Sequence, residues 1–248
     1  DSLRFQIRSQ GSVMQGPSAG EQRWLPLESN PEVVTDFAVR MGCPPQFQFH
    51  DVFGTDPEML AFVPTPVLAV MLLFPVTEIS KTLAAAAVTA AQEAGEAANG
   101  KIWFCKQKIQ NACGTIGLLH CLANLQGRVE LEGWLKNFLG KTADLDPDAR
   151  ADLLDGDTEL GKCHEEAAVL GQTRPPNLDE VVKLHFVCFI QQDGVMYELD
   201  GRKPLPLKLG GSSPATLLED AVKHIKTKYI DMDPTELNFN ILALGPAM

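Results

Sequence analysis

The sequence predicts an α+β fold, with an irregular α/β order of elements, in one domain. Helix and strand patterns are mixed along the chain, without the regular alternation that a doubly wound parallel sheet requires. A run of eight apolar residues at 67–74 is typical of a central strand in a sheet that is covered on both faces. The 248 residues, 45% of them apolar and 21% charged, are enough for a sizeable core.

The first 19 residues are expected to lie outside this domain. They are rich in Ser, Gln and Gly and show no apolar periodicity. They also lack the long apolar segment of a signal peptide. We therefore expect residues 1–19 to be an extension that is disordered or foreign to the natural chain, and residues 20–248 to form the domain.

The first predicted elements follow residue 30. Asn30 as an N-cap and Pro31 at the first helical position predict a helix, which Gly42 ends. Alternation of apolar and polar residues predicts a strand at 47–53. The Asp-Pro pair at 56–57 then predicts a short helix before the apolar strand.

An alanine-rich stretch leads into the middle of the chain. Residues 84–98 include nine alanines and few large apolar side chains, which predicts a solvated helix or a surface excursion. Further helical patterns begin at Cys113, cover 131–139, and run from Asp146 to about Leu154.

The C-terminal third contains a predicted hairpin. The preceding stretch 156–177 shows no convincing element, and a loop of that length is usually functional or mobile. Branched and aromatic residues at 181–190 and 195–199 predict two antiparallel strands. The remaining predicted segments are a loop at 201–211, a helix from Ser213 and a final strand at 238–244.

The charge balance excludes several classes of partner. With 21 basic and 32 acidic residues, the chain carries a formal net charge of −11, so nucleic acid and anionic membranes would repel it. The longest apolar run is far shorter than the roughly 20 residues that cross a bilayer. A basic protein or peptide tail is the partner that suits this charge.

The six cysteines indicate a reduced, intracellular protein. They are scattered without a C-x-x-C pair, and a chain of this length does not need disulfides. The five histidines do not cluster with them, so we expect no zinc site.

Cys113 is a candidate nucleophile because an apolar helical pattern begins there. The N-terminus of a helix favours the thiolate through its dipole and its free N–H groups. Gly114 and Gly117 would let another backbone or a substrate approach closely. The alternative interpretation is a buried structural cysteine.

The hairpin supplies a candidate base. In a simple hairpin centred between Gln192 and Asp193, His185 and Asp200 stand opposite each other on one face. A histidine held by a carboxylate is the base that a cysteine nucleophile requires. The alternative is a polar pair without function, which burial in apolar strands would penalise. A bulge at Gly194 would change the register.

Gln107 lies six residues before Cys113. Its side-chain amide could donate a hydrogen bond to a developing oxyanion. The alternative is a solvated glutamine in a turn.

These residues lie in longer motifs at 110–117, 184–186 and 197–204, accompanied by terminal motifs at 23–28 and 239–244. Together the motifs resemble the ubiquitin carboxyl-terminal hydrolase family, specifically its short L-three branch, over about residues 20–248.

The resemblance implies roles for the four candidate residues. Cys113 is then the nucleophile, His185 the general base and acid, and Asp200 the carboxylate that orients the imidazole. Gln107 is then the oxyanion donor. The implied fold has a papain-like core, a central antiparallel sheet flanked by helices, and a knotted backbone.

The implied activity is that of a thiol hydrolase. We expect it to cleave small or flexible adducts from the C-terminal glycine of ubiquitin, and of the related modifier NEDD8, through a thioester. The resemblance places the stretch 156–177 across the active site, where it would exclude bulky leaving groups. We expect a monomer in the cytoplasm and also in the nucleus, with no cofactor and no metal. The alternatives are a non-catalytic holder of monoubiquitin and a thiol amidase or acyltransferase acting on a small molecule.

The resemblance also implies three segments that contact ubiquitin. Glu28, Glu32 and Asp51 would face its arginine-bearing tail; without the resemblance they would be interpreted as ordinary surface acids. The other implied contact residues are Pro26, Leu27, Ser29, Asn30, Pro31, Ala168, Val169, Leu170, Gly171, Gln172, Thr173, Arg174, Pro175, Glu236, Leu237, Asn238, Phe239, Asn240 and Ile241.

Overall fold

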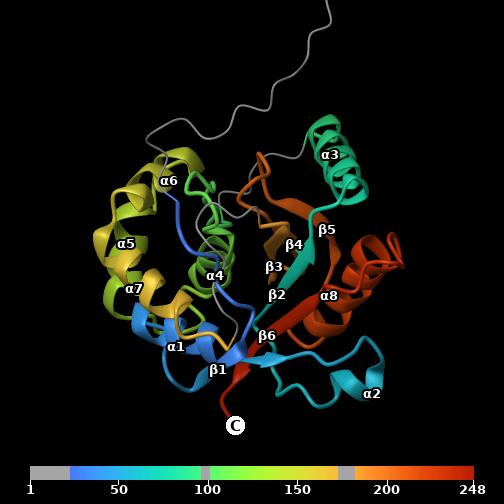
Figure 1. Cartoon of the computed structure of the whole chain (residues 1–248), viewed down its shortest axis with the longest axis horizontal. Helices are drawn as coiled ribbons and strands as arrows, with labels where there is room; N and C mark the ends of the chain where they lie inside the picture. The colour runs from blue at the N-terminus through green and yellow to red at the C-terminus, as the bar shows by residue number, and fades with distance from the viewer. Residues whose placement is uncertain (1–22, 96–100, 173–181) are drawn as a thin grey trace, which may run out of the picture.

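In a computed structural model of the chain, six strands form one sheet in the order β1-β6-β2-β3-β4-β5 (Figure 1). Every neighbouring pair is antiparallel, which confirms the predicted α+β class. The structure describes residues 23–95, 101–172 and 182–248, so the predicted extension at 1–19 lies outside it. The strands are β1 Phe47–Asp51, β2 Ala69–Pro75, β3 Leu184–Gln192, β4 Val195–Leu199, β5 Leu207–Gly211 and β6 Asn240–Pro246.

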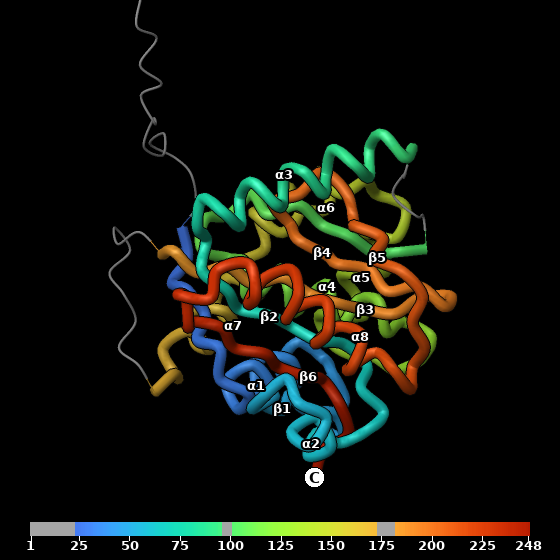
Figure 2. Tube along the Cα trace, turned by 90° about the vertical axis from the view of Figure 1, so that its right-hand side faces the viewer, coloured from blue at the N-terminus to red at the C-terminus, as the bar shows by residue number. Residues whose placement is uncertain are grey.

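Helices cover both faces of the sheet. One face packs on α4 and the helices around it, and the other packs on α8 (Figure 1). Figure 2 shows α8 lying across its face, with α3 beside the β5 edge. The helices are α1 Pro31–Met41, α2 Pro57–Leu60, α3 Glu78–Glu93, α4 Cys113–Ala123, α5 Gly133–Thr142, α6 Pro147–Asp155, α7 Thr158–Ala168 and α8 Leu217–Ile225, followed by the π-helix η1 Lys226–Ile230.

The central strand β2 is buried on both faces, as its apolar run predicted. Ala69 and Met71 pack in the core on the α4 face, whereas Val70, Leu72 and Phe74 pack in the core on the α8 face. Side chains alternate between the faces because successive residues of a strand point in opposite directions.

The first predicted helix has the predicted caps. The Asn30 side chain accepts hydrogen bonds from the N–H groups of Glu32 and Val33, at 2.9 and 3.4 Å. Gly42 ends α1 with a φ of 119°, a conformation that glycine adopts without a steric cost. The predictions for β1, α2, α4, α5, α6 and β6 are likewise confirmed to within a few residues. The alanine-rich stretch forms α3, most of whose side chains are exposed or half-buried.

Two segments that were expected to be irregular form regular elements. Helix α7 occupies much of 156–177, and the Asp157 side chain caps it by accepting from the N–H of Leu160 at 2.9 Å. Its buried stripe consists of Leu160, a histidine and two alanines, which an apolar pattern does not reveal. Strand β5 forms within 201–211, at the sheet edge, where glycine and proline are tolerated.

The predicted hairpin register is wrong by two residues. The turn is Asp193-Gly194, with φ values of 52° and 80°, so the paired part of β3 ends at Gln192 and not at Ile190 as predicted. Cys188 therefore pairs with Leu199. A shift of two residues leaves every side chain on its predicted face, because the strand period is two.

Helix α8 begins at Leu217, later than the predicted start at Ser213. A turn closed by a hydrogen bond from the Thr216 N–H to the Ser213 carbonyl precedes it, at 3.0 Å. Among the residues that the structure describes, no helix has the length and apolarity to span a membrane.

Candidate active site

Cys113 is the first residue of α4, as predicted. Asn111 enters the helix with a φ of 63°, and its side-chain amide donates to the carbonyl of Trp24 at 3.1 Å. Ala112 at the N-cap offers no capping side chain, so the N–H groups of the first turn lack the usual acceptor. The end of α4 is therefore suited to binding a negatively charged atom.

His185 and Asp200 are in contact despite the shifted register. His185 Nε2 and Asp200 Oδ1 are 2.7 Å apart, and both side chains are buried. Two residues on one face of a hairpin that are diagonal rather than opposite can still meet through their side chains. The N–H of Arg202 also donates to Asp200 Oδ1, at 2.9 Å, and fixes the carboxylate.

The Cys113 thiol is the second side chain that interacts with the His185 imidazole. The ring nitrogen Nδ1 is buried and makes no hydrogen bond of good geometry. Because Nε2 is occupied by Asp200, Nδ1 is the nitrogen that remains to exchange a proton with the thiol.

The environment favours a charged thiolate–imidazolium pair. Burial raises the pKa of the Cys113 thiol, but the nearby His185 imidazole and its charge outweigh burial and lower that pKa below its ordinary value. Burial lowers the pKa of His185, whereas Asp200 and the thiol raise it above 6.5. Burial also raises the pKa of Asp200, and the hydrogen bond and charge of His185, with the charge of Lys203, bring it down to about 2.

Gln107 lies against the turn that follows Asp200. Its N–H donates to the carbonyl of Gly201 at 2.9 Å, and its side-chain Nε2 donates to the carbonyl of Ile109 at 3.2 Å. A Cβ on Gly201 would lie 2.8 Å from Ile116 of α4 and 3.0 Å from Gln107, so only glycine lets these segments approach so closely. The Gln107 Oε1 atom is buried without a hydrogen-bond partner.

Cys113 borders a narrow cavity of about 210 Å³. Four residues of the predicted segment 26–31 form part of its wall, as does Ala168 at the end of α7. Leu73, Val182 and Leu184 also line it, and none of the three was predicted as a site residue. They are apolar residues in or next to strands, so sequence patterns do not distinguish them from core residues.

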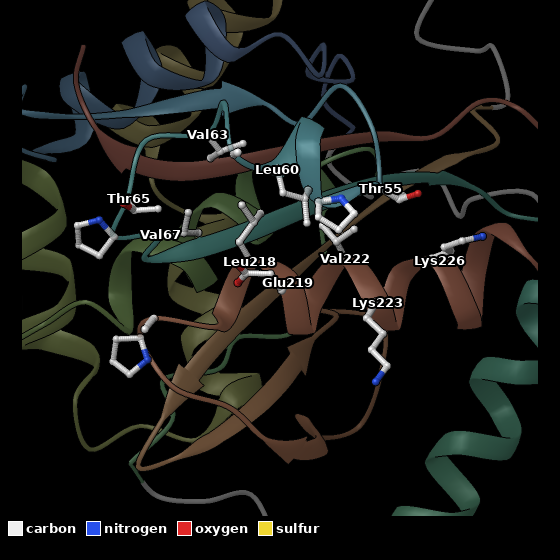
Figure 3. Close-up of a pocket in the computed structure, with 15 residues that line it drawn as sticks. Thr55, Leu60, Val63, Thr65, Val67, Leu218, Glu219, Val222, Lys223 and Lys226 are labelled. Carbon is white, nitrogen blue, oxygen red and sulfur yellow. The ribbon is translucent and has the colours of Figure 1, made fainter.

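A larger cavity of about 780 Å³ lies between α2 and α8, away from these residues (Figure 3). Leu60, Val63, Val67, Leu218 and Val222 form its apolar wall (Figure 3). None of the residues that line it is a cysteine or histidine, whereas the smaller cavity borders Cys113.

Several of the predicted ubiquitin-contact residues form one cluster beside the narrow cavity. Ser29 Oγ donates to Asn240 Oδ1 at 2.5 Å, and Asn240 Nδ2 donates to Asp51 Oδ1 at 3.3 Å. The Gln172 N–H donates to Glu28 Oε1 at 3.2 Å, which joins the segment after α7 to the same cluster. Residues far apart in the sequence therefore meet at one end of the sheet.

Other predicted contact residues are placed differently. Ile241 is only 5% exposed and packs in the α8-face core, so its side chain is not available for contact. Leu237 is 84% exposed, and Glu236 accepts from the N–H groups of Leu237 and Asn238. The predicted residues Thr173, Arg174 and Pro175 lie outside the described residues.

His164 supports the site and was missed by the sequence analysis. Its ring bonds to Thr115 Oγ1 through Nδ1 and to the carbonyl of Leu25 through Nε2, both at 2.7 Å. It thereby ties α7 to the first turn of α4 and to the segment that precedes Pro26. A single histidine in a stretch of Glu and Ala carries no sequence signal for this role.

Within the described ranges, no group of three or more His, Cys, Asp and Glu side chains is arranged to hold a metal ion.

Comparison with known proteins places the chain in a family. Residues 24–231 match the family profile described as "Ubiquitin carboxyl-terminal hydrolase, family 1". The chain belongs to this family. It is therefore a cysteine-type ubiquitinyl hydrolase, in agreement with the resemblance found in the sequence.

Relatives from distant organisms match along most of their length. A probable ubiquitin carboxyl-terminal hydrolase of Dictyostelium discoideum is 42% identical over 90% of this chain and 88% of the relative. Ubiquitin carboxyl-terminal hydrolase 3 of Arabidopsis thaliana is 42% identical over 92% of this chain and 96% of the relative. The Trichinella spiralis UCH37 catalytic domain, solved bound to ubiquitin vinyl methyl ester, has a TM-score of 0.71 at 26% identity, covering 92% of this chain and 97% of that one.

Proposed function

We propose that this member of the family releases small or flexible adducts from the C-terminal glycine of ubiquitin through a thioester on Cys113. The contact between His185 and Asp200, together with the interaction of the imidazole with a thiol at a helix N-terminus, is the observation that carries this proposal. The bound ubiquitin ester in the related UCH37 structure supports ubiquitin as the modifier.

The proposed reaction uses each group in a defined role. The Cys113 thiolate attacks the carbonyl carbon of the terminal glycine, and the oxyanion accepts hydrogen bonds from the Cys113 N–H and from Gln107 Nε2. The His185 imidazolium then protonates the leaving amine or thiol, and the thioester forms. Water attacks the thioester while His185 removes its proton. The carbon–sulfur bond then breaks, which releases ubiquitin and restores the Cys113 thiolate and the His185 imidazolium. Asp200 orients the imidazole throughout.

The narrow cavity supports a slender substrate. A tail that ends in two glycines has no side chains to clash with the walls near Cys113, so it can enter a cavity of about 210 Å³. The acids Glu28, Glu32 and Asp51 are proposed to face the arginines of that tail, which agrees with the negative charge of the chain.

We propose that the segment between Ala168 and Val182 restricts the leaving group, as in the L-three type. Both of these residues line the cavity at Cys113, so the connecting segment begins and ends at its rim. Inserting a long flexible linker within 171–176 should allow cleavage of di-ubiquitin. If the lengthened variant retains turnover of a small ubiquitin adduct but still leaves di-ubiquitin intact, restriction by this segment is wrong.

The family resemblance also supports NEDD8 as a second modifier and a cytoplasmic monomer as the form of the protein. Fluorogenic C-terminal amides of ubiquitin and NEDD8, measured in parallel, test the modifier. We expect turnover of both, with kcat/KM for each abolished by Cys113→Ala. Turnover of ubiquitin alone would restrict the function to ubiquitin, and turnover of neither would contradict the proposed function.

A further inference from the structure

A buried ion pair lies behind the Asp200 carboxylate. The Lys203 ammonium donates to Glu198 Oε1 and lies 3.8 Å from Asp200 Oδ2. Glu198, Lys203 and Asp200 are 3%, 7% and 6% exposed, so all three charges are removed from solvent. Burying a charge costs several kcal/mol unless a partner compensates it. Three buried charges side by side therefore indicate a role beyond stability.

Each partner of the pair is held in place by its surroundings. The Lys203 N–H donates to the carbonyl of Asp200 at 2.9 Å, which closes the turn after β4. Lys106 Nζ donates to the Lys203 carbonyl at 2.7 Å. Glu198 Oε2 lies 3.7 Å from His224 Nε2 of α8. The ammonium is therefore fixed between two carboxylates rather than free to reach solvent.

Asp200 uses its two oxygens for two different partners. Oδ1 accepts from His185 and from the N–H of Arg202, whereas Oδ2 faces Lys203. When His185 gives its proton to a leaving group, the imidazole becomes neutral and no longer balances the Asp200 charge. Lys203 is then the positive charge that remains beside the carboxylate. Titratable or charged groups around this cluster come from every neighbouring element: Lys106, Cys113, His120, His185, Glu198, Arg202, Lys208, His224, Lys228 and Tyr229.

We propose that Lys203 and Glu198 are positioning residues for the hydrolysis, and that Lys203 keeps Asp200 ionised while His185 is neutral. Glu198 accepts the hydrogen bond of the ammonium, holds it beside Asp200 and compensates part of its charge. This inference rests on the proposed function, because it assigns Asp200 the task of orienting His185. It extends the predicted set of four residues by a second layer on the α8 side of the sheet.

Lys203→Met tests the proposal by removing the charge. Lys203 borders a cavity of about 380 Å³ beneath α3, and methionine is shorter than lysine, so the substitution should cause no steric clash. Without the ammonium, Glu198 and Asp200 face each other as two buried carboxylates, and each raises the pKa of the other. A proton then remains on the pair at higher pH, and support for the His185 imidazolium is lost.

We expect Lys203→Met to lower kcat for a fluorogenic ubiquitin amide by about 10- to 100-fold, the size of one hydrogen bond to a charged group. KM should stay within about twofold, since Lys203 does not line the cavity at Cys113. The acid limb of the kcat/KM profile should move to higher pH. Adding Glu198→Gln removes the second carboxylate and should return the acid limb toward the wild-type position.

The matched control is Lys208→Met, an exposed lysine that lines the same cavity on β5, and it should leave kcat and the profile unchanged. A wild-type rate in Lys203→Met, or a lower rate with an unshifted profile, would overturn the positioning role. If Lys203→Met fails to fold, Lys203→Gln takes its place, because it also removes the charge and keeps Glu198: a shifted acid limb supports the proposal, and an unshifted one contradicts it.

A second readout separates this proposal from the proposed function. The rate at which iodoacetamide alkylates Cys113 reports the thiolate directly and needs no ubiquitin. If the wild type did not turn over ubiquitin, the proposed function would fail, but a shift of the alkylation profile in Lys203→Met would still support the positioning pair. An unshifted alkylation profile would contradict it.

Discussion

Helices α3 and α4 are both regular, yet they depend on the rest of the molecule in opposite ways. All eleven residues of α4 are buried, whereas Ala91 is the one residue of α3 that is buried. Local interactions hold α3: Thr77 and Ser80 form a capping box, and Lys81 pairs with Glu78 on the surface at 2.7 Å.

Tertiary contacts hold α4 instead. Thr115 bonds to His164 of α7, and Gly114 and Gly117 allow close approach to side chains of the N-terminal segment and the sheet. Propensity therefore explains α3, and packing explains α4. The difference teaches that the helix carrying the candidate nucleophile is fixed from several sides, so changes there should affect stability and activity together.

The largest expected effect is a loss of folding stability around α4, and not around α3, when the pH is lowered. Burial lowers the pKa of His120 in α4 and of His164, which holds α4, to about 4 each. Both take up a proton more readily in the unfolded chain. The stability gained by burying them in the neutral form is therefore complete above about pH 6.5 and is lost as the pH falls toward 4. Each should account for about 3 kcal/mol of the free energy of unfolding. His185, whose pKa is raised, acts in the opposite direction around and above pH 6.5.

Urea unfolding between pH 7 and pH 4 measures this dependence. His164→Gln cannot take up the proton and should show a smaller loss of stability over the same range. A free energy of unfolding that stays constant between pH 7 and pH 4.5 would contradict the burial of neutral histidines around α4.

The next largest effect should come from enlarging one side chain in each helix, which should destabilise the protein in α4 but not in α3. A Cβ on Gly114 would lie 2.9 Å from Leu27 Cβ and 3.3 Å from the Phe186 ring. Gly114→Val should therefore cost about 1–3 kcal/mol and lower activity, because Leu27 lines the cavity at Cys113. Ala85→Val, at an exposed position of α3, is the matched control and should cost no more than about 0.5 kcal/mol. Equal Tm values for the two variants would show that α4 is not tightly packed.

The smallest effects should come from α3 itself. Ala85→Glu places a charge in solvent and should leave kcat/KM within about twofold and stability within about 0.5 kcal/mol. Ala91→Glu is the internal comparison, since Ala91 packs against Leu205 and Leu207 and its replacement buries a charge. A marked loss of activity in Ala85→Glu alone would mean that α3 contributes to the site.

The sequence predicted the parts of the site that have local signals. The helix start at Cys113 followed from an apolar pattern, and the face shared by His185 and Asp200 followed from the strand period. The exact register did not follow, because it depends on which residues of the turn adopt positive φ, and both Asp193 and Gly194 do so. Helix α7 was missed because its buried stripe contains histidine and alanine.

The rest of the site depends on distant segments. Leu27, Cys113 and Leu184 line one cavity but lie in three separate segments. The apolar periodicity of one segment does not predict which other segment it will contact. The roles assigned to Gln107 and to the ubiquitin-contact residues came from the family resemblance, and they remain predictions that variants of these residues can test.

The central claim is that the Cys113 sulfur is the nucleophile of this chain. Treating the protein with ubiquitin bearing a C-terminal vinyl methyl ester, and then mapping the modified peptide by mass spectrometry, tests it directly, because the chain has five other cysteines. The account predicts one adduct, on Cys113, that is absent in Cys113→Ala and forms much more slowly in His185→Gln. An adduct on another cysteine, or undiminished labelling of Cys113→Ala, would contradict it.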